Sequence, residues 1–123
     1  MVDEGSIRGI PGFADGKRFD FSIHTRDLLK TPEWKQDQEH PPLSPKKAEN
    51  LAKSKLRTLV NHPNEWSIDE IALHDVKYSN RWFYVVKFSG RTQPHNSIPL
   101  MVIVVLMDGT TPEPKVVHLT QSK

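Results

Sequence analysis

Six histidines are the residues of this chain best suited to bind a metal ion, because neutral imidazole is a common metal ligand. Three of them, His24, His74 and His118, lie on or beside predicted strands and could converge. Zinc sites favour histidines two or four residues apart together with a carboxylate, and no pair in this chain has that spacing. We therefore predict no metal site and no cofactor.

Arrangements that support nucleophilic or acid–base catalysis are also missing from the sequence. Cysteine is absent, which excludes a thiolate nucleophile and a disulfide framework. Ser44 precedes a proline at the predicted start of a helix, so we assign it as a helix cap and not as a nucleophile. Asp69 and Glu70 are neighbours at the entry to a strand, and neighbouring strand residues point to opposite faces. The sequence therefore predicts a protein that is not an enzyme.

Large and amphipathic side chains could instead line a binding pocket between a helix and the mouth of a sheet. The candidate contacts of this kind are Lys55, Trp66, Trp82 and Tyr84. The alternative is that the aromatic residues are simply core, since large side chains dominate cores. Lys55 falls inside the apolar arc of its helix, so we expect its stem to lie on the core while its ammonium group reaches out toward solvent or a carboxylate of the sheet.

A polar loop at residues 90–97 is the second place where a partner could bind. It contains Arg91 and His95, which we take as candidate partner contacts. An open sheet edge would add free backbone groups that accept a further strand. These features favour a protein or peptide as the partner.

The helix that must position these residues begins at Ser44 and Pro45, a preferred cap followed by a preferred first helical residue. Its apolar positions recur every three or four residues and form one buried face. They are Ala48, Leu51, Ala52, Leu56, Leu59 and Val60. We assign Lys46, Asn50, Lys53 and Arg57 to the opposite, solvated face, and His62-Pro63 ends the helix.

Three strands are predicted after the helix, at residues 71–77, 81–89 and 98–107, and a short fourth strand at 115–119. Asp108-Gly109 indicates a tight turn between the last two strands. The strand at 98–107 is apolar on both faces, so it must be buried on both faces.

A single helix covers only one face of a sheet, so the second face needs its own cover. Residues 1–42 are interrupted by glycine and proline, and we expect them to form an extended arm. The arm could cover the second face through its large side chains, or a second copy of the chain could do so by self-association through a sheet face or edge. The arm residues concerned are Phe13, Phe19, Phe21, Ile23 and Trp34. Within the arm, residues 19–23 alternate like a strand, and residues 31–34 could form a helical turn.

The predicted fold class is therefore α+β, with one main helix packed on a curved antiparallel sheet of about four strands. The domain spans residues 43–123, and the extended N-terminal arm spans residues 1–42 and packs on it. A net charge of +2 argues against nucleic acid as the partner. The apolar run at 98–107 is too short to span a membrane as a helix.

Residues 1–5 are acidic and show no signal peptide. We expect a periplasmic or secreted protein if a signal peptide was removed before Met1, and a cytoplasmic protein otherwise.

Three segments resemble the PepSY family, a group of small bacterial domains with a cystatin-like fold. Residues 42–52 are similar to the family's opening helix, residues 82–88 to its middle strand, and residues 104–110 to its last strand and turn. The resemblance implies a helix cradled by a curved antiparallel sheet, in an extracytoplasmic module without enzymatic activity that binds or restrains other proteins. A Gln-x-Val-x-Gly string is absent, so cystatin-type protease inhibition is not expected.

Two functional hypotheses follow. The first is a non-enzymatic module that binds a protein or peptide. The second is a small-ligand-binding protein or enzyme that uses a cavity between helix and sheet.

Overall fold

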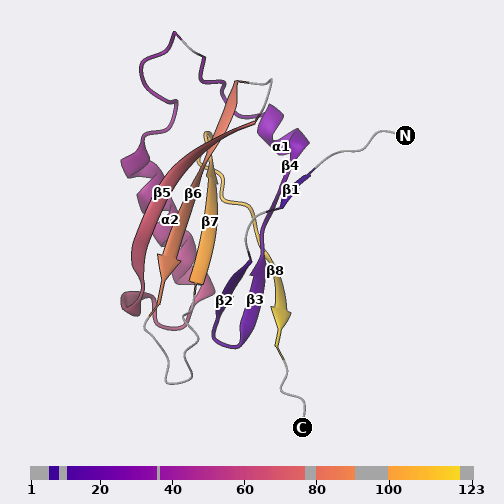
Figure 1. The fold of residues 1–123 in the computed structure, drawn as a ribbon, viewed down its shortest axis with the longest axis vertical. Helices are drawn as coiled ribbons and strands as arrows, with labels where there is room; N and C mark the ends of the chain where they lie inside the picture. Colours follow the sequence, from indigo (N-terminus) through magenta and orange to yellow (C-terminus); the bar gives the residue numbers. More distant parts are fainter. Residues whose placement is uncertain (1–5, 9–10, 36, 77–79, 91–99, 120–123) are drawn as a thin grey trace, which may run out of the picture.

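The computed structural model describes residues 6–8, 11–35, 37–76, 80–90 and 100–119. One main helix packs against a six-stranded antiparallel sheet, so the α+β class is confirmed (Figure 1). In sheet order the strands are β5 (Ser67–Val76), β6 (Arg81–Ser89), β7 (Leu100–Leu106), β2 (Gly12–Ala14), β3 (Lys17–Asp20) and β8 (Lys115–His118). The remaining elements are the paired strands β1 (Ser6–Arg8) and β4 (Ser22–His24), the helices α1 (Thr25–Leu29) and α2 (Pro45–Leu59), and the 3₁₀ turn η1 (Pro63–Glu65).

The main helix, α2, begins where the sequence predicts. The Ser44 hydroxyl accepts a hydrogen bond from the backbone N–H of Lys47 at 3.2 Å, and Pro45 occupies the first helical position. Ala48, Ala52 and Leu56 are buried along its inner face. The helix ends at Leu59, just before His62-Pro63.

The strands β5, β6 and β7 form the predicted antiparallel meander. β6 has the predicted bounds, and β5 starts four residues earlier than expected, at Ser67. β7 ends in the predicted turn, where Gly109 has a φ of +89° and its N–H donates to the Leu106 carbonyl at 2.9 Å. The short strand predicted at 115–119 is β8, while residues 77, 98 and 99 lie outside the described part of the chain.

The prediction of about four strands is wrong, because the segment expected to be an extended arm adds two strands to the sheet. β2 and β3 form a hairpin whose turn residues Asp15 and Gly16 both have positive φ, as two-residue hairpin turns require. β2 meets β7 through the pair Phe13 and Leu100, and β3 pairs with β8. The strand predicted at 19–23 is divided at Phe21 between β3 and β4.

The second face of the sheet is covered differently from the prediction. Ile23 and Leu28 pack over Phe83, Val104 and Leu106, so part of the N-terminal segment does cover this face. Of the five residues expected there, only Ile23 belongs to this cluster. Phe19 and Phe21 join the core on the helix side, Phe13 remains 41% exposed, and Trp34 packs against Trp82 with ring centroids 5.2 Å apart.

The helical turn predicted at residues 31–34 is also wrong, because the helix lies earlier, at α1. The Thr31 hydroxyl donates to the Leu28 carbonyl at 2.6 Å and so satisfies the C-terminal end of α1. Arg81 fixes the following segment to the sheet. Its guanidinium donates to the Leu29 carbonyl at 3.1 Å and pairs with Glu33 at 2.9 Å.

None of the helices within the described ranges has the length and apolar character needed to cross a membrane.

Candidate functional site: a groove between α2 and β5

One outer edge of the sheet is formed by β5, which among the described strands pairs only with β6. Figure 1 shows β5 at one side of the sheet and β8 at the other. β5 has ten residues, so it presents a long row of backbone N–H and C=O groups on its outer side.

The helix side of β5 carries an incompletely covered apolar row. Ile68, Ile71 and Leu73 pack against the main core, yet each remains only partly buried. The reason is the position of α2, which packs on β6 and β7.

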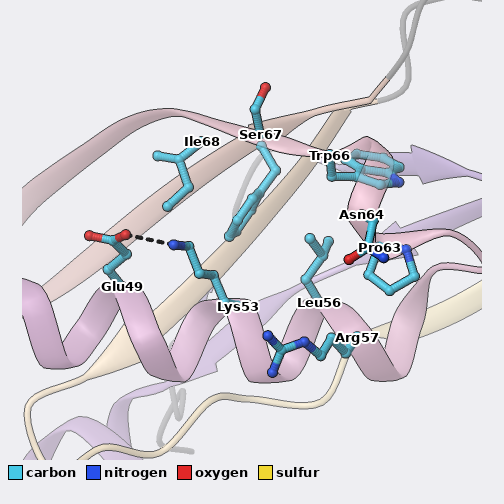
Figure 2. A pocket seen from close by; sticks show the side chains of 10 residues that line it. Glu49, Lys53, Leu56, Arg57, Pro63, Asn64, Trp66, Ser67 and Ile68 are labelled. Atoms are coloured by element: carbon cyan, nitrogen blue, oxygen red, sulfur yellow. Dashed lines mark ion pairs between the residues drawn. The ribbon is translucent and has the colours of Figure 1, made fainter.

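A groove of about 430 Å³ lies between α2 and the first residues of β5 (Figure 2). Leu56 and Phe88 are buried side chains that form its apolar floor. The residues that line it are Glu49, Lys53, Leu56, Arg57, Pro63, Asn64, Trp66, Ser67, Ile68 and Phe88.

The helix side of the groove is charged. The Nζ atom of Lys53 lies 2.8 Å from a carboxylate oxygen of Glu49, and Lys46 approaches the same carboxylate at 3.9 Å. The hydrogen bond from Lys53 is the main reason why the pKa of Glu49 is lowered. Arg57 forms no ion pair within the described residues, so the groove has an excess of positive charge on this side.

The β5 side of the groove is lined by the uncharged residues Trp66, Ser67 and Ile68, and the acidic residues of β5, which are Asp69, Glu70 and Asp75, do not line it. Asp69 accepts a hydrogen bond from the Ser89 hydroxyl at 3.0 Å, and Glu70 pairs with Lys87 at 3.7 Å. A β-bulge between Ile68 and Glu70 shifts the register at this point. The groove therefore has one basic wall and one neutral wall.

Two of the predicted site residues lie on or near α2. Trp66 is partly buried and lines the groove, between η1 and β5. Lys55 does not line it. Its side chain is 11% exposed and its ammonium group pairs with Glu113, in the segment that leads to β8. This contact matches the expectation that Lys55 lies along the core and reaches a carboxylate, although Glu113 precedes the strand.

Two other predicted residues lie on β6. Tyr84 is buried, and its hydroxyl donates to the Leu43 carbonyl at 2.6 Å. Burial raises the pKa of this hydroxyl. Trp82 is partly exposed and forms, with Trp34, Lys35, Gln38 and Asn80, a separate hollow of about 470 Å³. Arg91 and His95 lie outside the described residues.

Lys53 and Arg57, which the sequence places on a solvated helix face, line the groove. Glu49, Lys53, Leu56 and Arg57 follow one another at helical spacing, which is a usable signal for one side of a helix. This spacing indicates a groove only if the strand beside α2 is known to be the outermost strand of the sheet. Which strand lies there is decided by the tertiary structure and not by the local sequence.

In comparisons with protein-family models, curated proteins and solved structures, nothing matches this chain. Within the described ranges, histidine and carboxylate side chains form no group of three or more that could hold a metal ion. The groove beside β5 combines an apolar floor, a basic wall and the outer edge of a long strand.

Proposed function

We propose that this protein is a non-enzymatic module that binds an extended peptide segment of another protein as an additional strand on β5. The observation that carries the proposal is the ten-residue outer edge of β5, which lies beside a groove with an apolar floor. Strand addition of this kind uses main-chain hydrogen bonds for affinity and side-chain pockets for specificity.

The local register of β5 supports the proposal. Proteins protect open edges with bulges and charges, and β5 has a bulge with Asp69 and Glu70 near its start and Asp75 near its end. From Ile71 to Val76, however, the pairing with β6 is continuous and regular. A regular strand presents alternate N–H and C=O groups outward, so the edge from Ile71 to Asp75 can accept a partner strand.

The apolar row supports the proposal as well. An added strand would place its own side chains next to Ile71 and Leu73 and remove them from water. Each square ångström of apolar surface removed from water contributes about 25 cal/mol. The row therefore adds a hydrophobic contribution to the main-chain hydrogen bonds.

The test is a selection of peptides from a phage-displayed random library against the full chain, followed by synthesis of the enriched peptides. We expect a selected peptide to lose binding when alternate backbone nitrogens, those that would face β5, are methylated. Methylation at the other nitrogens should preserve binding and serves as the matched control. Equal binding by both methylated peptides, or no enrichment at all, would refute strand addition.

The mass of the chain in solution by light scattering distinguishes a peptide from a second copy of this chain. We expect a monomer that binds the selected peptide. A dimer that dissociates when the peptide is added would show that a second copy occupies the edge, and a dimer that excludes the peptide would refute the proposal.

A second candidate function is supported by the hollow at Trp34 and Trp82, whose volume lies in the range of small-molecule sites. In this alternative the protein binds a small ligand there. A thermal-shift screen with a metabolite panel tests it, because a ligand that binds the native state raises Tm by mass action. A Tm rise that is abolished in Trp34→Ala, with the fold retained, would favour the hollow over β5.

The PepSY-like relationship and an extracytoplasmic location remain part of the proposal. The antiparallel meander with one main helix is compatible with that resemblance.

A further inference from the structure

We infer that the peptide bound at β5 is acidic as well as apolar, and that a carboxylate of the peptide binds at Arg57. This inference rests on the proposed function and adds the chemistry of the partner. The inference is based on the charged and apolar residues that lie between the regular part of β5 and the groove.

The first step concerns where backbone pairing ends. The regular register runs from Glu70 to Val76, and the bulge between Ile68 and Glu70 interrupts it. A peptide that pairs with the regular part would leave the edge at the bulge and continue into the groove. In the groove the peptide contacts side chains of the protein and no longer pairs with a strand backbone. The groove must therefore recognise the side chains of the peptide.

The second step concerns the floor and the neutral wall. Leu56 and Phe88 are buried, and Ile68 is half-buried, with its side chain directed from β5 toward α2 in Figure 2. Trp66 and Pro63 close one end. An aliphatic or aromatic side chain of the peptide fits these surroundings, because it removes apolar area from water on both partners.

The third step concerns the basic wall. Glu49 is shared by Lys46 and Lys53, so two cations on α2 have one carboxylate between them. Arg57 adds a further cation at the groove and has no ion pair within the described ranges. A guanidinium can bind a carboxylate through two parallel hydrogen bonds. The peptide side chain that best complements this wall is therefore an aspartate or glutamate next to the apolar anchor.

The experiment uses the peptides selected from the random library and two variants of the full chain. Arg57→Glu reverses the charge at the groove. Lys47→Glu changes net charge by the same amount on the same helix, at an exposed position that does not line the groove. We expect the library to enrich peptides with a carboxylate beside an apolar residue. We expect Kd to rise about tenfold in Arg57→Glu and to change less than about twofold in Lys47→Glu.

A charge-swapped peptide sharpens the test. Replacing its carboxylate residue by lysine should weaken binding to the unmodified chain and restore binding to Arg57→Glu. The effect should also shrink as salt is raised, because an exposed ion pair is screened. Circular dichroism and Tm of both variants show whether the fold is retained.

The outcomes separate this inference from the proposed function. One outcome would overturn the inference and leave strand addition standing. In it, the selected peptides lose binding on backbone methylation, but they are not enriched in acidic residues and bind Arg57→Glu with an unchanged Kd. Peptides that bind equally well after backbone methylation would overturn both. Equal weakening by Arg57→Glu and Lys47→Glu would also contradict the inference, because it would show only a general effect of net charge.

Discussion

The two halves of the sheet are built and joined in different ways. The meander half consists of β5, β6 and β7, which have seven to ten residues each, and α2 packs on β6 and β7. The short half consists of β2, β3 and β8, which have three or four residues each. β2 reaches β7 through one registered pair, Phe13 with Leu100. The meander half therefore contributes most of the strand residues of the helix-side core, whereas the short half is joined to it through a single registered pair between β2 and β7.

Deleting residues 1–42 tests how much the meander half needs the rest of the chain, and we expect the largest effect here. The deletion removes β2 and β3, makes β7 an edge, and uncovers Phe83, Val104 and Leu106. Exposing three such side chains costs roughly 5–9 kcal/mol, comparable to the whole stability of a small domain. We expect an aggregated or oligomeric product by size-exclusion chromatography with light scattering. A soluble, folded monomer would contradict this prediction.

Gly12→Ala tests the junction itself. A Cβ atom at Gly12 would lie 2.8 Å from the Met101 sulfur and 3.1 Å from the Leu100 carbonyl oxygen, closer than side chains normally pack. We expect a loss of about 1–3 kcal/mol in the free energy of unfolding, measured in urea, because the backbones of β2 and β7 must separate. Ser54→Ala, on the exposed side of α2, is the control and should change stability little. An unchanged midpoint for Gly12→Ala would show that the junction tolerates a wider spacing.

Tyr84→Phe tests a hydrogen bond inside the meander half. It removes the donor to the Leu43 carbonyl and leaves a largely buried acceptor unpaired, which we expect to cost about 1–2 kcal/mol in urea denaturation. The raised pKa of Tyr84 gives a second readout. In the unfolded chain the Tyr84 hydroxyl ionises near pH 10, below its pKa in the folded protein. The native protein should therefore lose stability as the pH rises from about 10 through the folded-state pKa of Tyr84. The phenylalanine variant should lack this contribution, and an identical alkaline profile would contradict the assignment.

Lys55→Leu should have the smallest effect, although it breaks a contact between α2 and the segment leading to β8. The ammonium of Lys55 pairs with Glu113, whose side chain is largely exposed, and an exposed ion pair contributes about 0–1 kcal/mol. Leucine at this position adds apolar burial on α2. We expect stability to hold or to rise slightly and peptide binding to be unchanged. Lost binding with an intact fold would assign Lys55 to the partner site.

The sequence made the meander half predictable, and particular residues explain why. Ser44 and Pro45 mark the start of α2 by local chemistry, and the run of aromatic and β-branched residues in β6 indicates a strand without any tertiary information. In the short half, β8 was predicted, whereas β2 and β3 were not predicted as strands of the sheet, since strands of three or four residues next to glycine show too little periodicity. Residues 12–20 become sheet only because β7 and β8 are there to pair with them.

The candidate site was predictable only in part. Trp66 was identified by its size and character, and it does line the groove. Lys53 and Arg57 were missed because a basic helix face is usually just solvated. The role proposed for them depends on β5 being the outer strand, which the order β5-β6-β7-β2-β3-β8 decides and local sequence does not.

The most direct test of the account is amide hydrogen exchange of the full chain, resolved by residue, with and without a selected peptide. We predict that the peptide slows exchange in β5, at the amides from Ile71 to Asp75 that do not bond to β6, and leaves the β8 edge unchanged. Protection confined to β8 or to the hollow at Trp34 and Trp82, with β5 unaffected, would contradict strand addition at β5.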